Sequence, residues 1–504
     1  MPGFQVGCSD IIGVLPLLIL FGTALIVLMW DAFEKRPSRA PLVITILGAV
    51  GAAIAAFVNL DNVGRVFGGM ILDDSYAHYY AIVFCVAVIL TVLLAERYLK
   101  EEEILVGEFS ALILFSACGM IMLASSMDLI VTFLGLETMS IAFYVLAGLF
   151  RRKERSNEAA LKYFLLGSFA AGFFLYGIAL IYGSVGSTNL DTIRIVFMEA
   201  KSAAIVLGNP IFWVGVAMLL VGFAFKIAAF PFHQWAPDVY EGAPTIVTGF
   251  MSTAGKAGAF AALALIFDIT FAPLAGDPVA GAKLRTVLAV LSLGSMFYGN
   301  ITAIAQTNLK RMLAYSSIAH AGYMLLGVAA LSPAGVRAVA IYLTVYTLMQ
   351  IGAFGVIAIL EKDTGAGLEL SDYVGLAKRR PWLAFFMSVM MLSLAGIPPF
   401  GGFFGKYYIF SVAIGSGLTM YAILGVIASL ISVYFYLRVI VLMYFREPEH
   451  SSIAGQVEVV GGGTIAMSGA RSAWLALLIA AIGLLVTGVM PNILASMVQK
   501  FFAH

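Results

Sequence analysis

The residues best suited to chemistry are four lysines in long apolar stretches of the chain. They are Lys162, Lys226, Lys256 and Lys406. An ionisable side chain at the centre of a bilayer costs about 2.5–3.5 kcal/mol on insertion scales. Lys226 lies about sixteen residues inside its apolar stretch. Because four such costs require a use, we expect these lysines to take part in proton transfer.

A second interpretation stays open for some of these cations. A lysine or arginine near a helix end can extend its long side chain to the membrane interface. This interpretation applies equally well to Lys162, which lies about one turn inside its stretch, and it also applies to Arg438. Lys256 is expected near the start of its stretch. The small residues before it, at 252–255, indicate close packing or a cavity.

Two acids, Glu137 and Asp268, also lie among apolar residues. Glu137 has apolar neighbours for about two turns on either side, whereas Asp268 lies near the end of its stretch and is open to an interfacial interpretation. A buried carboxylate alone takes up a proton, but one beside a lysine can stay charged. When the carboxylate moves, the lysine changes between proton donor and acceptor, so Glu137 and a lysine would form a proton-responsive pair.

Among the histidines, His320 lies in the middle of an apolar stretch, in the segment SSIAHAGYMLL. An imidazole can relay protons near neutral pH. The alternative is a structural histidine bonded to Ser316 or Tyr323. His233, beside Pro231, is expected to be structural. The other three are expected near the surface, namely His78, His450 and His504.

The composition identifies the elements that must position these residues. The chain has 504 residues, of which 62% are hydrophobic and 11% charged, with a net charge of +1. Soluble domains have about 25% charged residues, so a soluble enzyme of this size is excluded, and 37 Phe and 21 Tyr exclude disorder. The three cysteines are far apart and form no metal or disulfide pattern. The fold class is an all-α polytopic membrane protein.

The apolar runs are long and unbroken, which favours helices of about 20 residues over the strands of a barrel. The N-terminal run shows no cleavage site and is expected to be a span. Fourteen spans are expected, at 11–30, 40–58, 76–95, 107–125, 127–150, 157–182, 210–230, 252–272, 284–304, 309–331, 336–360, 382–414, 419–445 and 472–497.

Loops rich in lysine and arginine alternate along the chain with loops that are poor in them, and this alternation predicts the orientation. Alternate loops carry 17 of the 29 cations and the opposite loops carry 7. The richer side should be the cytoplasm. Both termini are then expected on the outer side of the membrane, as an even number of spans requires.

Two of the spans are expected to be broken. In FKIAAFPFHQWAPDVYEGAP, Pro231 follows Lys226 by five residues, and in LSLAGIPPFGGFFGKYYIF the pair at 398–399 precedes Lys406. Proline removes a helix hydrogen bond, and the freed carbonyls must face protein or water. The two broken spans lie five apart in the sequence and run in opposite directions across the membrane, which predicts two inverted five-helix repeats. The regions would be 1–106 (three helices), 107–273 and 284–446 (the repeats), and 447–504 (a loop and the last span).

The segments GLETMSIAFYVL, EAALKYFLLGSFAAGFFLYG, FKIAAFPFHQWAPDVYEGAPT, LKRMLAYSSIAHAGYMLLG and GIPPFGGFFGKYYIF carry a resemblance. Together they resemble the subunit N family of bacterial NADH–quinone oxidoreductase, respiratory complex I, over roughly residues 70–450. Single motifs are shared with the related subunits L and M and with cation/proton antiporters. Subunit M-like chains carry glutamate where Lys406 stands.

The resemblance implies a role for each position. Glu137 would pair with Lys226, Lys256 would be the central lysine, and Lys406 would connect to one side of the membrane. Lys162 would modulate the pair, and His320 would lie on the hydrated axis between the half-channels. The neighbours implied are subunit M on one side and subunits A, J and K on the other. No dinucleotide, Walker, haem or iron–sulfur motif is present, so NADH, FMN, iron–sulfur clusters and quinone would belong to partner subunits.

The function expected is indirect coupling, in which redox work elsewhere drives proton transfer through the glutamate and lysines. Three alternatives stay open. The first is a free-standing or Mrp-type cation/proton antiporter subunit, and the second is a subunit of another redox complex, such as a membrane hydrogenase. The third is a structural scaffold, which the buried charges disfavour.

Overall fold

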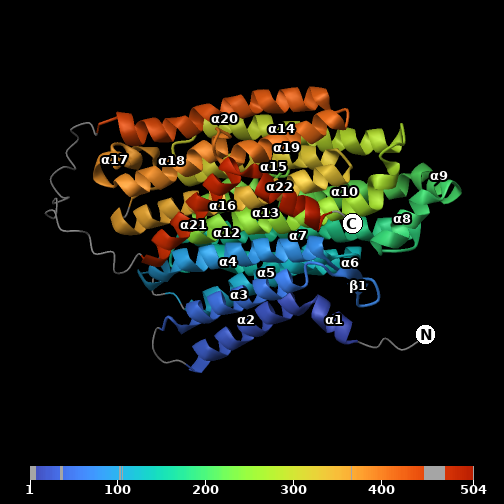
Figure 1. The fold of residues 1–504 in the computed structure, drawn as a ribbon, viewed down its shortest axis with the longest axis horizontal. Helices are drawn as coiled ribbons and strands as arrows, with labels where there is room; N and C mark the ends of the chain where they lie inside the picture. Colours follow the sequence, from blue (N-terminus) through green and yellow to red (C-terminus); the bar gives the residue numbers. More distant parts are fainter. Residues whose placement is uncertain are drawn as a thin grey trace.

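The computed structural model describes residues 7–33, 38–101, 104, 106–364, 366–447 and 471–502. Long helices run side by side along one axis and form an elongated bundle (Figure 1). Twelve helices in the described part are long and apolar enough to cross a membrane, or thirteen if the bent pair α9 and α10 counts as one span. The prediction of a polytopic helical membrane protein is confirmed, whereas the number fourteen stays a prediction.

The first half of the chain, up to residue 242, forms helices and one pair of short strands. Its elements are α1 (Cys8–Gly13), α2 (Leu15–Phe33), α3 (Ala40–Val58), β1 (Val63–Val66), β2 (Ile71–Asp74), α4 (Ser75–Glu101), α5 (Val106–Ser125), α6 (Leu129–Ala147), α7 (Glu154–Val185), α8 (Leu190–Met198), α9 (Ala200–Gly208), α10 (Pro210–Lys226) and α11 (Trp235–Gly242). The antiparallel β1–β2 pair and the short helices α8 and α9 were not expected from the sequence.

The second half contains the two most enclosed of the long helices, Leu309–Ala329 and Pro333–Glu361. It comprises α12 (Thr245–Phe250), α13 (Lys256–Ile266), α14 (Ala280–Ile304), α15 (Leu309–Ala329), α16 (Pro333–Thr364), α17 (Leu376–Arg379), α18 (Pro381–Ala395), α19 (Gly401–Gly415), α20 (Thr419–Phe445), α21 (Arg471–Val489) and α22 (Pro491–Phe501). The expected last span divides into α21 and α22 at Met490.

One expected boundary was wrong in a way that matters. The eighth span was expected to start at residue 252, but the helix begins at Thr245 as α12 and continues through the π-helical segment Met251–Gly255 into α13. A second π-helical segment, Phe267–Phe271, follows α13. Pro244 stands at the N-cap, where its fixed φ suits the start of a helix. Lys256 is therefore about 17 Å along a continuous helix and not near its start.

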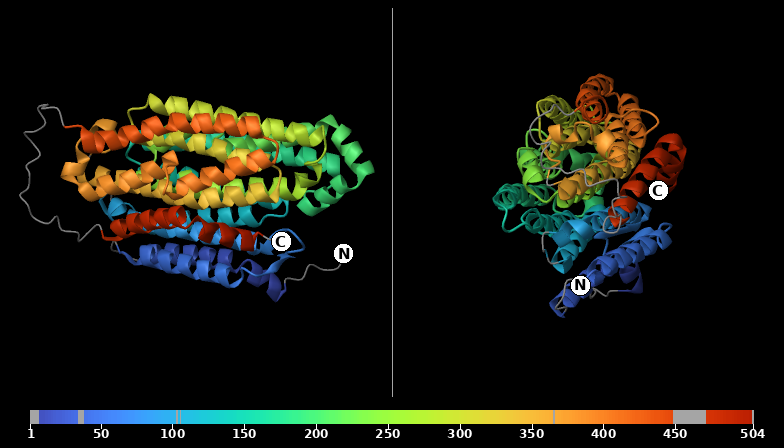
Figure 2. Two further views of the ribbon diagram at one scale, coloured as in Figure 1. Left: turned by 45° about the horizontal axis from the view of Figure 1, so that its top comes forward. Right: turned by 90° about the vertical axis from the view of Figure 1, so that its left-hand side faces the viewer.

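The helices differ strongly in how far neighbours enclose them. α2 and α3 lie along one edge of the bundle and pack on α5 and α4 (Figure 2). α15 is the opposite case: it is the least apolar of the twelve long helices, and its whole membrane-length window is buried. α14, α16, α19 and α20 all pack against it. The polar residues of α15 therefore face protein and not lipid.

Corresponding helix pairs pack in both predicted repeats. α5 packs on α6 and α14 packs on α15, while α7 packs on α10 and α16 packs on α18 and α19. α7 and α16, which hold the same place in the two halves, each have 32 residues. This correspondence supports the inverted repeats and the region boundaries 107–273 and 284–446, which stay predictions.

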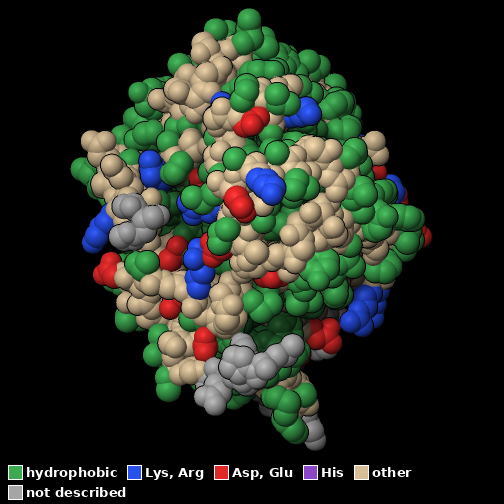
Figure 3. All heavy atoms as spheres, turned by 90° about the vertical axis from the view of Figure 1, so that its right-hand side faces the viewer, with side chains coloured by type: hydrophobic (Ala, Val, Ile, Leu, Met, Phe, Trp, Pro, Cys, Tyr) green, Lys and Arg blue, Asp and Glu red, His purple; other side chains and the backbone are tan. Residues whose placement is uncertain are grey.

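The two ends of the bundle carry different elements. We call the end with α11, α17 and the α6–α7 connection the basic end, because Arg151, Arg152, Lys153 and Arg155 lie there. α8, α9 and the β1–β2 pair lie at the opposite end (Figure 1). Figure 3 shows that opposite end, where charged side chains of both signs stand among apolar and polar ones. The cations Lys35 and Arg36 and the loop 451–470 lie outside the described residues.

Candidate functional site

The first break lies at the end of α10. The helix stops at Lys226, a loop with Pro231 follows, and α11 begins at Trp235. The Trp235 indole Nε1 donates a hydrogen bond to the backbone carbonyl of Phe225 at 2.8 Å. The same carbonyl also accepts a hydrogen bond from the Ala228 backbone N–H at 3.0 Å. A side chain of the next helix thus helps to satisfy the helix end at the break, as a helix end inside a membrane requires. The expected break is present, and protein groups line it.

Lys226 is buried, with 5% of its surface exposed. Its Nζ donates to the Ser140 Oγ at 2.7 Å and to the Tyr163 hydroxyl at 3.1 Å. The Tyr163 ring stacks on the Trp235 ring, with centroids 4.4 Å apart and planes 6° apart. α11 thus positions the tyrosine that holds Lys226. Ser140 and Tyr163 were not singled out from the sequence, although Ser140 lies three residues after Glu137 and so on the same face of α6.

Glu137 lies close to Lys226 without forming a direct ion pair. Within the described part of the chain, no oxygen of Glu137 lies within 4.0 Å of the Lys226 ammonium, although the two charges interact electrostatically. The Glu137 side chain is half-buried, and its Oε1 has no hydrogen-bond partner there. The structure therefore brings the predicted pair together in an open arrangement, in which Lys226 is held by hydroxyl groups.

Lys256 lies almost fully buried in the middle of the bundle. Its Nζ donates to the backbone carbonyl of Ser317 in α15 at 2.6 Å. The π-helical segment directly before it puts Gly255 against the Phe143 ring, where a Cβ would approach within 2.5 Å. The same ring lies 5.5 Å from the Lys226 ammonium. Phe143 therefore forms an apolar contact between the surroundings of Lys226 and those of Lys256.

His320 is hydrogen-bonded through both ring nitrogens. Its Nδ1 lies 2.7 Å from the Tyr342 hydroxyl and its Nε2 lies 3.0 Å from the Tyr436 hydroxyl. Tyr436 also hydrogen-bonds to Ser316. The bonds to Ser316 or Tyr323 that the structural alternative named are not the ones observed. Ser316 is linked to His320 through Tyr436, and Tyr323 makes a ring contact with His320. Sequence spacing within one helix could not identify hydroxyl groups from α16 and α20.

Lys406 lies at the second break, between α18 and α19. Its Nζ donates to the backbone carbonyl of Ala395, the last residue of α18, and to the Ser429 Oγ, both at 2.9 Å. The ammonium lies 5.1 Å from the centre of the Tyr323 ring. A cation at the C-terminal end of a helix is stabilised by the carbonyl groups there. Lys406 itself therefore satisfies the helix end that the prolines create.

The buried polar groups lie along one line across the bundle, which the apolar ring of Phe143 interrupts between Lys226 and Lys256. It runs from Lys226 past Phe143 to Lys256, through the α15 segment that carries His320, and through Tyr323 to Lys406. Its lysines donate to hydroxyl and carbonyl oxygens. Buried ammonium groups of this kind can gain and lose protons, and the hydroxyl groups between them can conduct protons.

Lys162 lies apart from this line, towards the basic end. Its side chain is 42% exposed, and its Nζ lies 2.6 Å from Glu158 and 2.9 Å from Asp238. Arg311 bridges Asp238 and Glu241, at 2.9 Å to each. Burial raises the pKa of Asp238, but hydrogen bonds from Lys162 and Arg311 outweigh burial and hold it below its usual value. The geometry agrees with the interfacial alternative for Lys162.

Other charged groups differ from their expected settings. His78 was expected near the surface but is buried, with Nε2 2.7 Å from Asp73. Lys310, counted as a loop cation, lies buried in the first turn of α15 and donates to the Ala243 carbonyl at 2.6 Å. His233 is buried against the rings of Phe230 and Tyr298. His450 and His504 lie outside the described residues.

A metal site is not formed by the part of the chain that the structure describes, where no three His, Cys, Asp or Glu side chains gather. Cys85 and Cys118 are buried and Cys8 is exposed, all as free thiols. The candidate site for proton transfer is the line of buried lysines and His320 described above.

Known proteins share both the sequence and the fold. The family described as NADH:quinone oxidoreductase/Mrp antiporter, TM, matches residues 126–432. NADH-quinone oxidoreductase subunit N from Trichlorobacter lovleyi is 42% identical over 97% of this chain and 96% of its own length. A chain of respiratory complex I from Thermus thermophilus is 32% identical, with a TM-score of 0.76, covering 95% of this chain and 98% of that one.

The fold also occurs in another respiratory assembly. A chain of the archaeal membrane-bound sulfane sulfur reductase has a TM-score of 0.80 at 24% identity, covering 97% of both chains. At that identity the likeness is one of fold alone. The match to subunit N extends over nearly the whole chain, and the family match at residues 126–432 spans both broken helices. The chain therefore belongs to the subunit N family of NADH–quinone oxidoreductases, within the wider group of NADH:quinone oxidoreductase and Mrp antiporter membrane subunits.

Proposed function

We propose that this chain translocates protons in the membrane arm of a respiratory complex I. The observation that carries the proposal is the line of buried lysines and His320 between the two broken helices. Burying four ionisable groups so deeply costs free energy, and ionisable residues inside membrane proteins typically mark proton relays. Both breaks border this line, and discontinuous helices in corresponding halves of a membrane protein point to an ion pathway. The enzyme of which the chain is a subunit would be a proton-translocating NADH:quinone oxidoreductase.

The proposed transfer begins at the Glu137–Lys226 pair. Approach of the Glu137 carboxylate would favour the protonated form of Lys226, and its withdrawal would release the proton towards Lys256. Because Phe143 lies between the two lysines, the transfer needs water or a movement of the ring. From Lys256 the proton would pass along α15, with His320 as the relay, to Lys406. Lys162 would act on Lys226 from outside through Asp238 and α11.

The surroundings of the subunit follow from the same proposal. Redox work on NADH, FMN, iron–sulfur clusters and quinone would take place in partner subunits. Subunit M would lie on one side, and subunits A, J and K on the other. The basic end would face the cytoplasm of a bacterial inner membrane, and both termini would lie in the periplasm.

Glu137→Gln tests the proposal directly. We expect the variant complex to assemble in normal amount, because the Glu137 Oε1 has no partner to lose in the described structure. NADH-driven proton uptake by inverted membrane vesicles should fall at least about tenfold, since a positioned proton-transfer group contributes roughly 10²–10⁴-fold. NADH–quinone turnover should fall with it.

The matched control is Asp268→Asn. Asp268 also has a buried carboxylate oxygen without a partner, but it lies towards the opposite end, outside the proposed path. We expect it to retain proton uptake. Normal uptake in an assembled Glu137→Gln complex would contradict the proposal.

Trp235→Phe should weaken coupling without removing a charge. The phenyl ring keeps most of the stacking on Tyr163 but loses the indole N–H, so the Phe225 carbonyl keeps only its hydrogen bond from the Ala228 backbone. A typical hydrogen bond contributes about 0.5–1.5 kcal/mol, so the end of α10 should loosen around Lys226. We expect a partial loss of proton uptake. Tyr373→Phe, which also loses one buried hydrogen bond to a backbone carbonyl, should leave uptake intact. Equal effects of both would make Trp235 a stability residue only.

Two other functions share the fold. The family description includes Mrp antiporters, and the sulfane sulfur reductase has the same architecture. An antiporter subunit would exchange sodium or potassium for protons without a redox partner, whereas a subunit of another redox complex would respond to a donor other than NADH. Purification with the native partners, followed by assays with NADH and with an imposed sodium gradient, separates these functions.

A further inference from the structure

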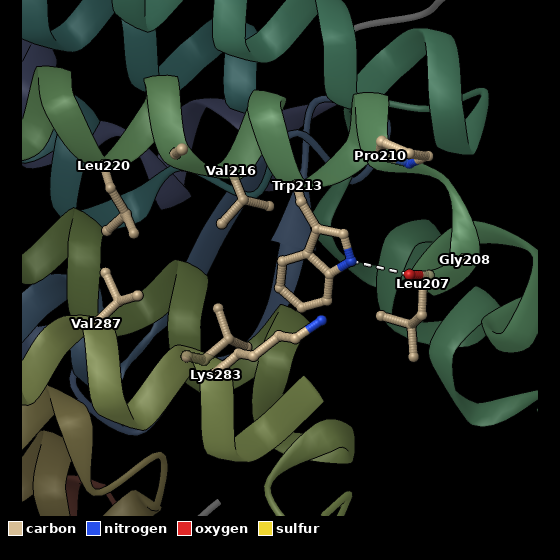
Figure 4. Close-up of a pocket in the computed structure, with 10 residues that line it drawn as sticks. Leu207, Gly208, Pro210, Trp213, Val216, Leu220, Lys283 and Val287 are labelled. Carbon is tan, nitrogen blue, oxygen red and sulfur yellow. Dashed lines mark hydrogen bonds between the residues drawn. The ribbon is translucent and has the colours of Figure 1, made fainter. Parts of the chain in front are cut away.

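A crevice opens between α10 and α14, the last transmembrane helix before the first break and the first helix of the second half. Its volume is about 520 Å³. Figure 4 shows Val216 and Leu220 of α10 and Val287 of α14 pointing into it from opposite walls. The two helices each pack elsewhere, α10 on α7 and α14 on α15. The crevice therefore follows the seam between the two halves of the chain.

One end of the crevice is polar. Lys283 and Trp213 each lie three residues after the start of their helix, and so at the level of a membrane interface. The Lys283 ammonium lies 5.2 Å from the centre of the Trp213 ring, and the indole Nε1 donates to the Leu207 carbonyl at 2.9 Å (Figure 4). Within the described structure no carboxylate pairs with Lys283. Tryptophan and lysine are the residues that typically mark this level of a membrane.

The rest of the crevice is apolar and extends into the membrane. Leu220 lies seven residues beyond Trp213 on α10, about 10 Å deeper, and Val287 lies four residues beyond Lys283, about 6 Å deeper. A ligand that fits must carry a negative charge at one end and a long apolar part at the other. A free phosphate ion would leave the apolar walls uncovered.

The size of the crevice argues against a protein helix as its occupant. A helix about 10 Å wide with a 5.4 Å pitch fills about 400 Å³ per turn, so the crevice would hold little more than a single turn. A flexible acyl chain can fill the same narrow space along its length. We propose that the crevice binds one anionic phospholipid, with its phosphate at Lys283 and an acyl chain in the seam between α10 and α14.

The test uses the assembled complex in liposomes that contain phosphatidylglycerol with a photoactivatable group in its acyl chain. After illumination, mass spectrometry maps the labelled peptides. We expect labelling of the facing segments of α10 and α14 to exceed that of α2, whose outer face is also exposed. Lys283→Glu should lower the crevice labelling at least about fivefold, the factor that corresponds to about 1 kcal/mol per basic residue near anionic lipid.

Two further variants make the result specific. Lys500→Glu makes the same charge change at an exposed lysine of α22, away from the crevice, and should leave its labelling unchanged. Val287→Trp fills the apolar part while keeping Lys283, and should lower the labelling as well. Labelling of the seam no stronger than that of α2 would overturn the proposal, as would labelling that Lys283→Glu does not lower.

Discussion

Replacing Lys226 with alanine is expected to lower NADH-driven proton uptake in inverted vesicles at least about tenfold, in a complex that still assembles. Lys226 is the cation nearest to Glu137 in the proposed path and is held by the hydroxyl groups of Ser140 and Tyr163. Without its ammonium, movement of the carboxylate has no proton to release. Proton uptake and NADH–quinone turnover should therefore fall together.

Alanine also leaves a cavity in a buried site, so a second variant is needed. Methionine is unbranched and of similar length, and Lys226→Met removes the charge while filling most of the space. We expect it to assemble better than Lys226→Ala and to be equally inactive. Ser140→Ala removes one of the two acceptors and should reduce uptake less. If Lys226→Met retained normal uptake, Lys226 would be a structural lysine and the antiporter alternative would become the one to test.

Lys406→Ala is expected to have the second-largest effect, because it removes two contributions at once. It removes the last cation of the path, and it leaves the Ala395 carbonyl at the end of α18 without its donor. An unsatisfied buried carbonyl costs about 1–3 kcal/mol. Less complex should therefore accumulate, as measured by native gel electrophoresis. Proton uptake per assembled complex should fall at least about tenfold.

Lys406→Gln separates these two contributions. The amide N–H can donate to the carbonyl, but the side chain carries no titratable proton. We expect accumulation to recover while uptake stays low. If Lys406→Gln also restored proton uptake, the only role of Lys406 would be to donate a hydrogen bond to the end of α18. Charge removal at Lys256 should have a smaller effect than at Lys406. Lys162 forms ion pairs with two partly exposed acids, so removing its charge should have the smallest effect.

The sequence predicted those features that depend on lipid being a poor solvent for polar groups. Lysines inside apolar runs and prolines at 231 and 398–399 stand out against that background, and the structure has both breaks and the buried Lys226, Lys256 and Lys406. Glu137 was found in the same way. These features need no knowledge of which helices are neighbours.

The contacts of these residues depend on helix neighbours and could not be predicted. The hydroxyl groups on His320 come from α16 and α20, and the carbonyl on Lys256 comes from α15. The start of the helix at Thr245 was missed because the prolines at 237 and 244 extended the expected break as far as residue 252. Lys310 was counted as a loop cation because the sequence does not show whether a basic residue at a helix start faces solvent or, as here, donates a hydrogen bond to a buried carbonyl, that of Ala243.

The enclosure of α15 has a consequence for biosynthesis. A nascent helix enters the bilayer from the insertion machinery largely according to its own apolar character. α15, which carries His320, is the least apolar of the long helices and exposes no membrane-length face to lipid. It is therefore the helix least able to insert alone. α14 and α16 flank it in sequence and in space, so we expect that both must arrive and shield α15 before the centre of the proposed proton path can form.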